Sequence, residues 1–517
     1  MTDPASNSVN AAAEPLLLLS PDDDVAVARR PQRAGAELTV AGRKLVVAAP
    51  LPAGHKIAVR PVAVGKPVRK YGQIIGFATK DIAPGDHVHG HNLDCGAYER
   101  DYAFAAAVPP PPLPTEERFF NGYLRADGRV GTRNYLVLAS TVNCSATVCN
   151  AIADRFTKDV LKPYPNIDGV IALTHKGGCG MAASGFDRDS LQKTIGGYCK
   201  HPNVFDSIVI GLGCEVNQAS ELIDVQQLVG KGRPQRNFSI QGMGGIQNSI
   251  DAGVRQIGEM LAAANDVRRT KQSAKHLVLG TNCGGSDGAS GVTANPALGV
   301  ASDLLVAQGG TSILAETTEI YGAEHLLTRR AVSRAVGEKL IERIRWWESY
   351  AAMFGAKIDN NPSHGNKEGG LTTIFEKSLG AVAKAGASAL VDVVGYADPV
   401  RTPGLVVMDT PGFDPVSVTG IVAGGANVVV FTTGRGSVFG SKPTPTIKIS
   451  TNTPLYERMT DDMDLDAGTI LAGEPVEVVG RRIFELILSV ANGETTKSER
   501  QGVGDEEFAP WLIGPVL

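Results

Sequence analysis

The sequence has few cysteines and no long hydrophobic run. Its 517 residues include only 7 cysteines, an odd number, which argues against a framework of paired disulfides. No run approaches the roughly 18 uninterrupted apolar residues that a membrane-spanning helix needs. The N-terminus lacks a basic region ahead of an apolar stretch, and the four leucines at 16–19 are too few for a secretion signal. We therefore expect a cytoplasmic protein with no membrane partner.

An excess of one charge is also missing. The 50 basic and 54 acidic residues give a net charge of -4, and no long basic block occurs, so we expect no nucleic-acid partner. The 43% of hydrophobic residues can build a core, which excludes disorder as the main state. At about 150 residues per domain, the length predicts two to four domains.

The N-terminal part of the chain differs from the rest in composition and in its pattern of apolar residues. Residues 1–13 are small and polar and are predicted to be a flexible tail. Between residues 14 and 107, short β-rich runs alternate with Gly and Pro, which predicts a small, mostly β domain. Residues 108–117 contain four consecutive prolines and are predicted to form a semi-rigid linker.

After the linker, apolar strand-like runs alternate with helix-length segments. This pattern is typical of parallel sheets built from strand–helix–strand units. It predicts one α/β domain over residues 118–270 and another over 271–517, with a polar boundary near 268–273. The expected fold is therefore α/β, with two Rossmann-like parallel domains that follow the small β-rich domain.

Four cysteines occupy similar positions after predicted strands. The carboxyl ends of parallel strands form the ligand crevices of open α/β sheets. Thiolates at such an edge suit iron or an iron–sulfur cluster, which makes these cysteines candidate metal ligands. The alternative is that they are small buried hydrophobic residues, because no CxxC motif is present. The four residues are Cys144, Cys179, Cys214 and Cys283.

The histidines suggest two further chemical features. In the segment HVHGHN, strand alternation places His87, His89 and His91 on one face, where they could bind a metal or form a solvated edge. His175, in THKGGCG, lies near the predicted crevice and is a candidate for exchanging a proton with a substrate.

Several polar, Gly-rich loops also follow predicted strands. Their backbone N–H groups are suited to binding anions, and Arg435 in TTGRGS could bind a carboxylate through two hydrogen bonds. Because GxxxxGK[ST] and GxSxG are absent, a P-loop ATPase and a serine hydrolase are disfavoured. Together the loops predict a pocket for a small polyhydroxylated anion. Candidate residues in these loops and in the polar segments ETTEIYGAEHLL and NPSHGNKEGGLTTIFEKSLG are Ser286, Asp287, Glu316, Asn366, Lys377 and Arg435.

Several long segments, in order, resemble the altronate/galactarate dehydratase family of sugar-acid dehydratases. They include GHKIAV, YGQIIGFATKDIAPGDHVHGHN, GLGCE, CGGSDGASGVTANPALG and NPSHGNKEGGLTTIFEKSLG, and the resemblance covers nearly the whole chain. It implies an N-terminal SAF-type β-clip domain and a catalytic body. It also implies dehydration of an aldonate or aldarate to a 2-keto-3-deoxy acid, with iron(II) as the metal.

The resemblance further implies that His55 and Arg435 belong to the site. His55, His175, Glu316 and Lys377 are the candidates for proton transfer, and the roles of base and acid among them stay open. A lone iron(II) ion and an iron–sulfur cluster are both retained, as are several sugar acids. Alternatives are a sulfo-lyase acting on a sulfolactate-like acid and a non-catalytic sugar-acid or metal sensor. We expect a homodimer or a higher homo-oligomer.

Overall fold

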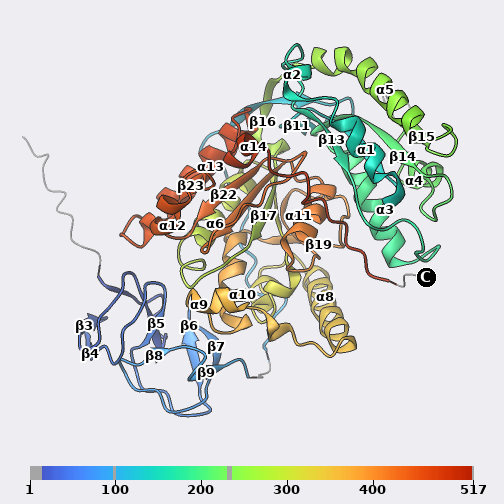
Figure 1. Cartoon of the computed structure of the whole chain (residues 1–517). Coiled ribbons are helices and arrows are strands. Elements are labelled where there is room, and N and C mark those ends of the chain that lie inside the picture. Colours follow the sequence, from blue (N-terminus) through green and yellow to red (C-terminus); the bar gives the residue numbers. More distant parts are fainter. Residues whose placement is uncertain (1–13, 97–99, 230–235, 515–517) are drawn as a thin grey trace, which may run out of the picture.

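The structure is a computed structural model that describes residues 14–96, 100–229 and 236–514. The tail predicted over residues 1–13 lies outside the described residues. Figure 1 shows a β-rich N-terminal part below a larger body that contains two sheets flanked by helices. The predicted combination of a β-rich N-terminal part with a mixed α/β body is therefore observed. No helix among the described residues is long and apolar enough to cross a membrane.

The N-terminal strands form two small antiparallel sheets and a hairpin, in the orders β1-β2-β5-β8, β6-β7-β9 and β3-β4. Two tight turns set the hairpin registers. Ala41 and Gly42 between β3 and β4, and Tyr71 and Gly72 between β6 and β7, all have positive φ, as a two-residue type I′ turn requires. The strands are β1 (Leu16–Leu17), β2 (Val25–Ala28), β3 (Glu37–Val40), β4 (Arg43–Val46), β5 (Lys56–Ala58), β6 (Pro67–Lys70), β7 (Gln73–Ala78), β8 (His87–Val88) and β9 (Leu93–Asp94).

The middle domain contains a four-stranded parallel sheet in the order β13-β12-β14-β15. Every residue of the central strand β12 is buried, as expected for a parallel strand covered by helices on both faces. Its strands are β12 (Tyr135–Ser140), β13 (Gly169–Leu173), β14 (Val204–Gly211) and β15 (Asn237–Ser239). Its helices are α1 (Ala146–Ala153), α2 (Lys158–Leu161), α3 (Phe186–Cys199), α4 (Ala219–Val225) and α5 (Ile246–Asp266).

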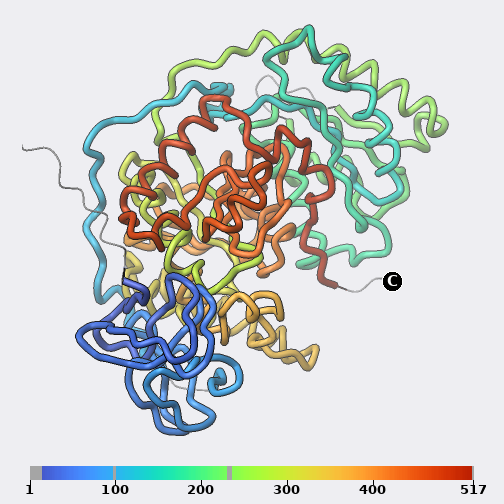
Figure 2. Tube along the Cα trace, turned by 60° about the vertical axis from the view of Figure 1, so that its left-hand side comes forward, coloured from blue at the N-terminus to red at the C-terminus, as the bar shows by residue number. Residues whose placement is uncertain are grey.

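The chain reaches the middle domain along an extended segment that Figure 2 shows in light blue, running up one side of the body. The segment leads into β10 (Phe119–Leu124), which pairs with β11 (Val130–Gly131) and with β16 (Thr270–Ser273). Because β10 precedes the middle domain and β16 follows it, this antiparallel pairing joins the two ends of that domain.

The C-terminal domain is built on a seven-stranded parallel sheet in the order β19-β20-β18-β17-β21-β22-β23. Apolar residues of α6 and α13 cover one face, and α11 packs with α3 of the middle domain on the other. The strands are β17 (Val278–Cys283), β18 (Thr311–Leu314), β19 (Leu390–Val394), β20 (Gly404–Met408), β21 (Val428–Thr433), β22 (Thr446–Ser450) and β23 (Leu465–Asp466). The helices are α6 (Ala294–Ala307), α7 (Glu324–Thr328), α8 (Arg334–Met353), α9 (His364–Glu368), α10 (Ile374–Val382), α11 (Asp414–Ala423), α12 (Thr453–Arg458), α13 (Val476–Ala491) and α14 (Lys497–Gln501).

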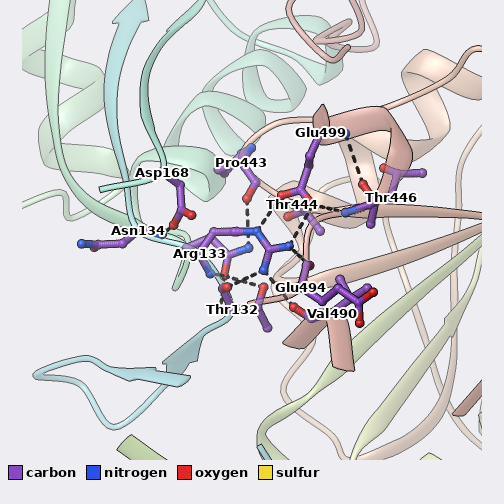
Figure 3. Close-up of polar contacts among 12 residues, drawn as sticks. Thr132, Arg133, Asn134, Asp168, Pro443, Thr444, Thr446, Val490, Glu494 and Glu499 are labelled. Carbon is purple, nitrogen blue, oxygen red and sulfur yellow. Dashed lines mark hydrogen bonds and ion pairs between the residues drawn. The ribbon is translucent and has the colours of Figure 1, made fainter. Parts of the chain in front are cut away.

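Buried ion pairs hold both the N-terminal strands and the middle domain against the C-terminal domain. Glu376 on α10 accepts from Lys56 and Lys70 of the N-terminal strands, each at 2.9 Å, and all three side chains are fully buried. Figure 3 shows Arg133, just before β12, enclosed by residues of the C-terminal domain. Its guanidinium donates to the Glu499 carboxylate at 2.6 and 2.8 Å and to the carbonyl of Val490 at 2.9 Å. Because such groups must be paired when buried, these contacts fix how the parts dock.

Candidate functional site

Buried ionisable side chains gather where β17 and β18 end. Cys283 is the last residue of β17, and Glu316 follows β18 with a left-handed backbone (φ 67°). Lys384, in the turn after α10, donates to Glu316 Oε2 at 2.5 Å and lies 3.0 Å from Cys283 Sγ. All three side chains are buried, so their charges interact through protein and not through water.

A second pair lies beside this group. Lys377 on α10 donates to Glu319 Oε1 at 2.7 Å and to Asn361 Oδ1 at 2.9 Å. Asn361 Nδ2 also donates to Glu319 Oε1, at 2.8 Å. Asp414, at the start of α11, accepts from Asn282 Nδ2 at 3.0 Å. The helix α10 thus brings its lysine to a sheet edge that supplies the carboxylates.

Cys283, Glu319 and Lys377 line one cavity of about 490 Å³, which we call the Lys377 cavity, whereas Glu316 and Lys384 lie behind its wall. Amide and hydroxyl side chains on one wall can bind the hydroxyl groups of a ligand, whereas Trp347, Tyr350 and Phe354 form an apolar wall. The polar and charged residues that line it are Cys283, Thr318, Glu319, Asn360, Asn361, Ser363, Asn366, Lys377 and Asp414.

The carboxyl groups here have different protonation behaviour. Burial, together with the negative charges of Glu316 and Glu319, raises the pKa of Asp414 to about 8. Burial also raises the pKa of Glu316 to about 7, although Lys384 opposes the shift. At neutral pH, Asp414 therefore keeps its proton, which makes it a proton donor. Carboxyl groups whose pKa is raised by burial beside a cavity are typical of acid–base sites.

A larger cavity of about 690 Å³, the His55–Arg435 cavity, lies between the N-terminal strands and the C-terminal domain. His55 precedes β5, and Arg435 follows β21. The contact between Arg435 and Glu368 is long, at 3.4 Å, and both side chains are about half exposed, so the guanidinium is accessible to a ligand. Arg29, Arg30 and Arg458 also line this cavity.

The loop after β17 forms a wall common to the two cavities. Gly285 lines the Lys377 cavity, and Asp287 lines the His55–Arg435 cavity. Asp287 Oδ1 accepts from Ser290 and Thr451 at 2.9 Å, so this carboxylate holds the loop in place. The carbonyl of Ser286 accepts from Asn366 Nδ2 at 2.9 Å. Of the predicted residues, Asn366 and Lys377 line one cavity, and His55, Asp287 and Arg435 line the adjacent one.

The histidines of the N-terminal strands lie together beside the second cavity. His55 Nδ1 is 3.0 Å from His87 Nε2, and the His55 and His89 rings are stacked at 5.5 Å. His91 lies next to His87, with ring centroids 5.5 Å apart. Burial and the neighbouring cations lower the pKa of both His55 and His87 to about 4. These imidazoles are neutral at pH 7, which is the form that binds metals.

The four cysteines predicted as metal ligands are divided between the two sheets. Cys144, Cys179 and Cys214 follow the adjacent strands β12, β13 and β14, and all three are exposed. Their loops are joined by backbone hydrogen bonds of 3.1 Å from Asn143 to Gly177 and from Asn217 to Gly178. Cys283 is buried at the edge of the other sheet.

Among the described residues, one set of Cys, His, Asp or Glu side chains has three ligand atoms within 4.8 Å of one another. It consists of Cys283, Glu316 and Glu319, so this group could hold a metal ion.

His175 lies in the middle domain and is almost fully buried. Its Nε2 is 2.9 Å from the Ser140 carbonyl, and its Nδ1 accepts from the backbone N–H of Gly177 at 3.2 Å. Burial lowers its pKa to about 4. Both ring nitrogens are therefore occupied by backbone groups, and the imidazole holds the Cys179 loop against β12.

The sequence analysis did not single out Asp414 and Lys384. Asp414 had a signal, because it stands in the loop TPGFDP immediately after a strand. Lys384 had none, since the surrounding AVAKAGAS reads as an ordinary helix end. Its position near Cys283 depends on how η5 (Ala383–Ala385) packs against α6 and β18.

Three family models match consecutive parts of the chain. The "Altronate/galactarate dehydratase SAF domain" matches residues 14–96. The "D-galactarate dehydratase/Altronate hydrolase, second domain" matches residues 122–265. The model "D-galactarate/Altronate dehydratase, C-terminal" matches residues 274–516. These matches fall on the N-terminal, middle and C-terminal parts described above.

Curated relatives cover most of the chain. Altronate dehydratase of Escherichia coli (strain K12) is 36% identical over 480 residues, which are 92% of this chain and 95% of the relative. Galactarate dehydratase (L-threo-forming) of the same strain is 39% identical over 466 residues, 88% of this chain and 89% of the relative. The beta subunit of (2R)-sulfolactate sulfo-lyase from Chromohalobacter salexigens is 33% identical over 398 residues, 76% of this chain and 96% of the relative.

Proposed function

Because the chain belongs to the altronate/galactarate dehydratase family, we propose that it is a hydro-lyase that converts an aldonate or aldarate to a 2-keto-3-deoxy acid. The observation that supports this function best is the Lys377 cavity. There a buried ammonium, a carboxylate and a protonated carboxyl group face one space of about 490 Å³. The volume of this cavity lies in the range typical of small-molecule sites, so the cavity can hold a six-carbon acid.

The reaction first requires removal of the proton α to a carboxylate. The resulting enediolate carries two negative charges, so nearby positive charge must stabilise it. Lys377 supplies that charge, and the Glu319 carboxylate, 2.7 Å from its ammonium, is our candidate for the base. Asn361, which contacts both side chains, would hold this pair in position.

Loss of the β-hydroxyl then requires an acid that protonates the leaving oxygen. We assign this role to Asp414, because it lines the same cavity and its pKa is raised to about 8. The enol that forms rearranges to the 2-keto acid. Together, Glu319 removes one proton and Asp414 delivers another, so that one water leaves per turnover.

Arg435, Ser286, Asp287 and Asn366 stay predictions for binding the substrate, and His55 stays a prediction for proton transfer. Arg435 and His55 line the adjacent cavity, where the guanidinium is accessible and could bind a carboxylate. An aldarate has a second carboxylate at its far end, which an aldonate lacks. Arg435→Ala should therefore raise KM more for an aldarate than for an aldonate.

Iron(II) is the metal that family membership suggests, and two sets of side chains compete as its ligands. The first set is Cys283, Glu316 and Glu319, where Glu316 Oε1 has no hydrogen-bond partner among the described residues. However, Lys384 and Lys377 already lie against these three side chains, so two ammonium groups occupy the place of a cation. This set fits a further cation poorly.

The second set is Cys144, Cys179 and Cys214, whose exposed thiols follow three adjacent strands. Thiolates are the usual ligands of iron–sulfur clusters. These three cysteines therefore suit iron, in the form of a cluster, better than the set of Cys283, Glu316 and Glu319 does. We propose that they would hold a cluster with three protein ligands. When bound, such a cluster supplies a Lewis acid for a substrate oxygen.

The metal assignment is tested on protein purified without oxygen. We expect a broad absorption band near ~400 nm, together with bound iron and acid-labile sulfide. Cys144→Ser, Cys179→Ser and Cys214→Ser should each lose the band and the sulfide, whereas Cys283→Ser should keep both. Loss of iron from Cys283→Ser alone would instead assign the metal to the carboxylate set.

The activity is tested with a panel of aldonates, aldarates and sulfolactate, by following 2-keto acid formation. We expect turnover of altronate or galactarate, and no turnover of either by iron-loaded protein would exclude the dehydratase. The sulfo-lyase alternative is motivated by the 33% identical beta subunit. Release of sulfite from sulfolactate, without dehydration of any sugar acid, would establish that alternative.

A further inference from the structure

A third cavity, of about 470 Å³, lies between the middle and C-terminal domains. The turn before β11 and the last turns of α3 form one side of it. The short helix η2 (Ala274–His276), the loop after β19 and the end of α11 form the other. Both domains therefore contribute to its wall, and neither the proposed base nor the proposed acid does.

The lining of this cavity is strongly basic. It contains five Lys or Arg side chains and two histidines, and no Asp or Glu is among its lining residues. A cleft lined by one sign of charge concentrates the electric field and attracts anions. The seven residues are Arg129, Lys193, Lys200, His201, Lys275, His276 and Arg401.

Neighbouring groups account for part of this charge. Lys193 pairs with Asp398 at 2.7 Å, and Arg129 pairs with Asp127 at 2.6 Å. Lys200 donates to the carbonyl of Gln226 at 2.6 Å.

Lys275 and Arg401 have no acidic partner in the part of the chain that the structure describes. Both are exposed, and they belong to segments on the C-terminal side of the cavity. Their charges act on the other basic groups. Burial, Arg129 and Arg401 lower the pKa of Lys200, and burial and Lys275 lower the pKa of His276. These cations repel one another, and a bound anion would relieve that repulsion.

We propose that this cavity binds a compact polyanion, carrying phosphate or several carboxylate groups, that bridges the middle and C-terminal domains. A cavity of this volume accommodates a small metabolite. Because the ligand would contact Arg129 and Lys200 from one domain and Lys275 and Arg401 from the other, it would stabilise their docking. The site is separate from the proposed reaction, so it does not depend on that function.

The proposal is tested by isothermal titration calorimetry and thermal unfolding of the full chain, with pyrophosphate and citrate as probes. Ionic strength is held constant with sodium chloride, so that screening does not change. We expect at least one probe to bind and to raise the unfolding temperature. Binding of pyrophosphate alone would identify a phosphate ligand, and binding of citrate alone a polycarboxylate.

The double variant Lys275→Gln/Arg401→Gln should bind the probe at least ~10-fold more weakly, since two charges that face it are lost. The matched control Lys80→Gln/Arg155→Gln removes two exposed cations elsewhere and should bind as the unmodified protein does. Binding should also take up protons, because an anion raises the pKa of His276, which burial and Lys275 lower. Failure of both probes to bind, or unchanged affinity in the Lys275/Arg401 variant, would overturn the proposal.

Discussion

Lys377 stands between a carboxylate and an open cavity, and this position gives it a specific task. Its ammonium is nearly buried and contacts Glu319 at 2.7 Å. Burial alone would lower the pKa of Lys377, but Glu319 and Cys283 raise it. The side chain is therefore a fixed positive charge that can stabilise an enediolate, and a poor proton acceptor.

We predict that Lys377→Met lowers kcat by about 10³-fold, since one preorganised donor to the developing charge is lost. The binding of substrate, measured as KM, should change much less. Lys339→Met, which removes an exposed lysine, is the control and should leave kcat unchanged. A kcat within a few-fold of the unmodified enzyme, in folded protein, would remove Lys377 from the mechanism.

Asp414 sets the alkaline limit of the reaction in our proposal. Its carboxyl faces Glu316, Glu319 and Lys377 and accepts from Asn282. Because its pKa is raised to about 8, the acid is present below that pH and is lost above it. We predict that kcat falls as pH rises through about 8. Asp414→Asn should lose about 10²-fold or more in kcat and should lose this alkaline limb.

The profile is measured from pH 6 to 9.5 for both proteins, with circular dichroism at each pH to show that the fold is retained. If Asp414→Asn keeps the same fall of kcat at alkaline pH, another group is the acid.

At the residue scale, loop chemistry could be predicted and pairings could not. Glu316 follows a strand and Lys377 stands in the polar segment NPSHGNKEGGLTTIFEKSLG, and each of these is a local signal. That Glu316 pairs with Lys384, 68 positions away, depends on the packing of distant segments. Likewise, nothing in the sequence TPGFDP indicates that Asp414 is buried or that its pKa is raised. Spacing therefore shows which residues are available but does not show which pairs form.

At the element scale, α10 carries both the lysine of the proposed mechanism and the carboxylate that binds the N-terminal strands. One turn carries Lys377, which faces the cavity, and Glu376, which binds Lys56 and Lys70 of the N-terminal strands. Adjacent residues on a helix point in different directions, so α10 can serve both sides. Docking of the N-terminal part therefore helps to fix the position of Lys377.

We predict that Glu376→Gln destabilises the protein by about 3–5 kcal/mol, because two fully buried ammonium groups lose their counter-charge. The two lysines depress the pKa of Glu376, although burial alone would raise it. The stability from this carboxylate is thus fully present above its unfolded pKa of roughly 4.3 and decreases progressively as the pH falls from there towards its depressed pKa in the folded protein.

Urea unfolding at pH 7 and pH 4 measures both effects. The difference between the unmodified protein and Glu376→Gln should be large at pH 7 and should shrink at lower pH. Lys339→Gln, which removes one partner of an exposed ion pair, is the control and should cost less than about 1 kcal/mol. Equal stability of Glu376→Gln and the unmodified protein at pH 7 would contradict the buried-charge account.

The alternation of apolar runs and helix-length segments predicted the parallel strands of the body. The order of those strands could not be predicted, since β17 pairs with both β18 and β21, and β21 is about 150 residues further along the chain. The same limit explains the cysteines. Cys144, Cys179 and Cys214 follow strands and Cys283 is the last residue of one, but only the assembled sheets show that Cys283 belongs to a different sheet. The Rossmann-like description of the two units stays a prediction.

At the scale of the whole molecule, the C-terminal segment joins the two sheets. After α14 it runs, without regular secondary structure, from the C-terminal domain towards the middle domain (Figure 1). Phe508 contacts Tyr198 of α3 edge-on at 4.8 Å. Leu512 packs against Gly177, where an added Cβ would lie 2.9 Å from its side chain. The segment therefore lies against the loop that carries Cys179.

Trp511 connects the proposed metal loop with the wall of the Lys377 cavity. Its ring stacks on Trp347, which lines that cavity, at 5.2 Å, and contacts Phe186 edge-on at 5.2 Å. Phe186 begins α3, directly after the loop of Cys179. The cluster and the proton-transfer groups act on one substrate in our proposal. This aromatic contact must then hold the two domains in a fixed relative position.

We therefore predict that Trp511→Ala lowers kcat by about 10²-fold, because small displacements of reacting groups are costly, while bound iron and sulfide stay unchanged. Trp511→Phe, which keeps an aromatic ring, should recover most of the activity, and the exposed Leu113→Ala is the control for an ordinary truncation. Turnover, iron content and thermal unfolding are measured together, so that a loss of fold is distinguished from a loss of register. Full activity in a folded, iron-loaded Trp511→Ala protein would show that the two domains need no such contact to act together.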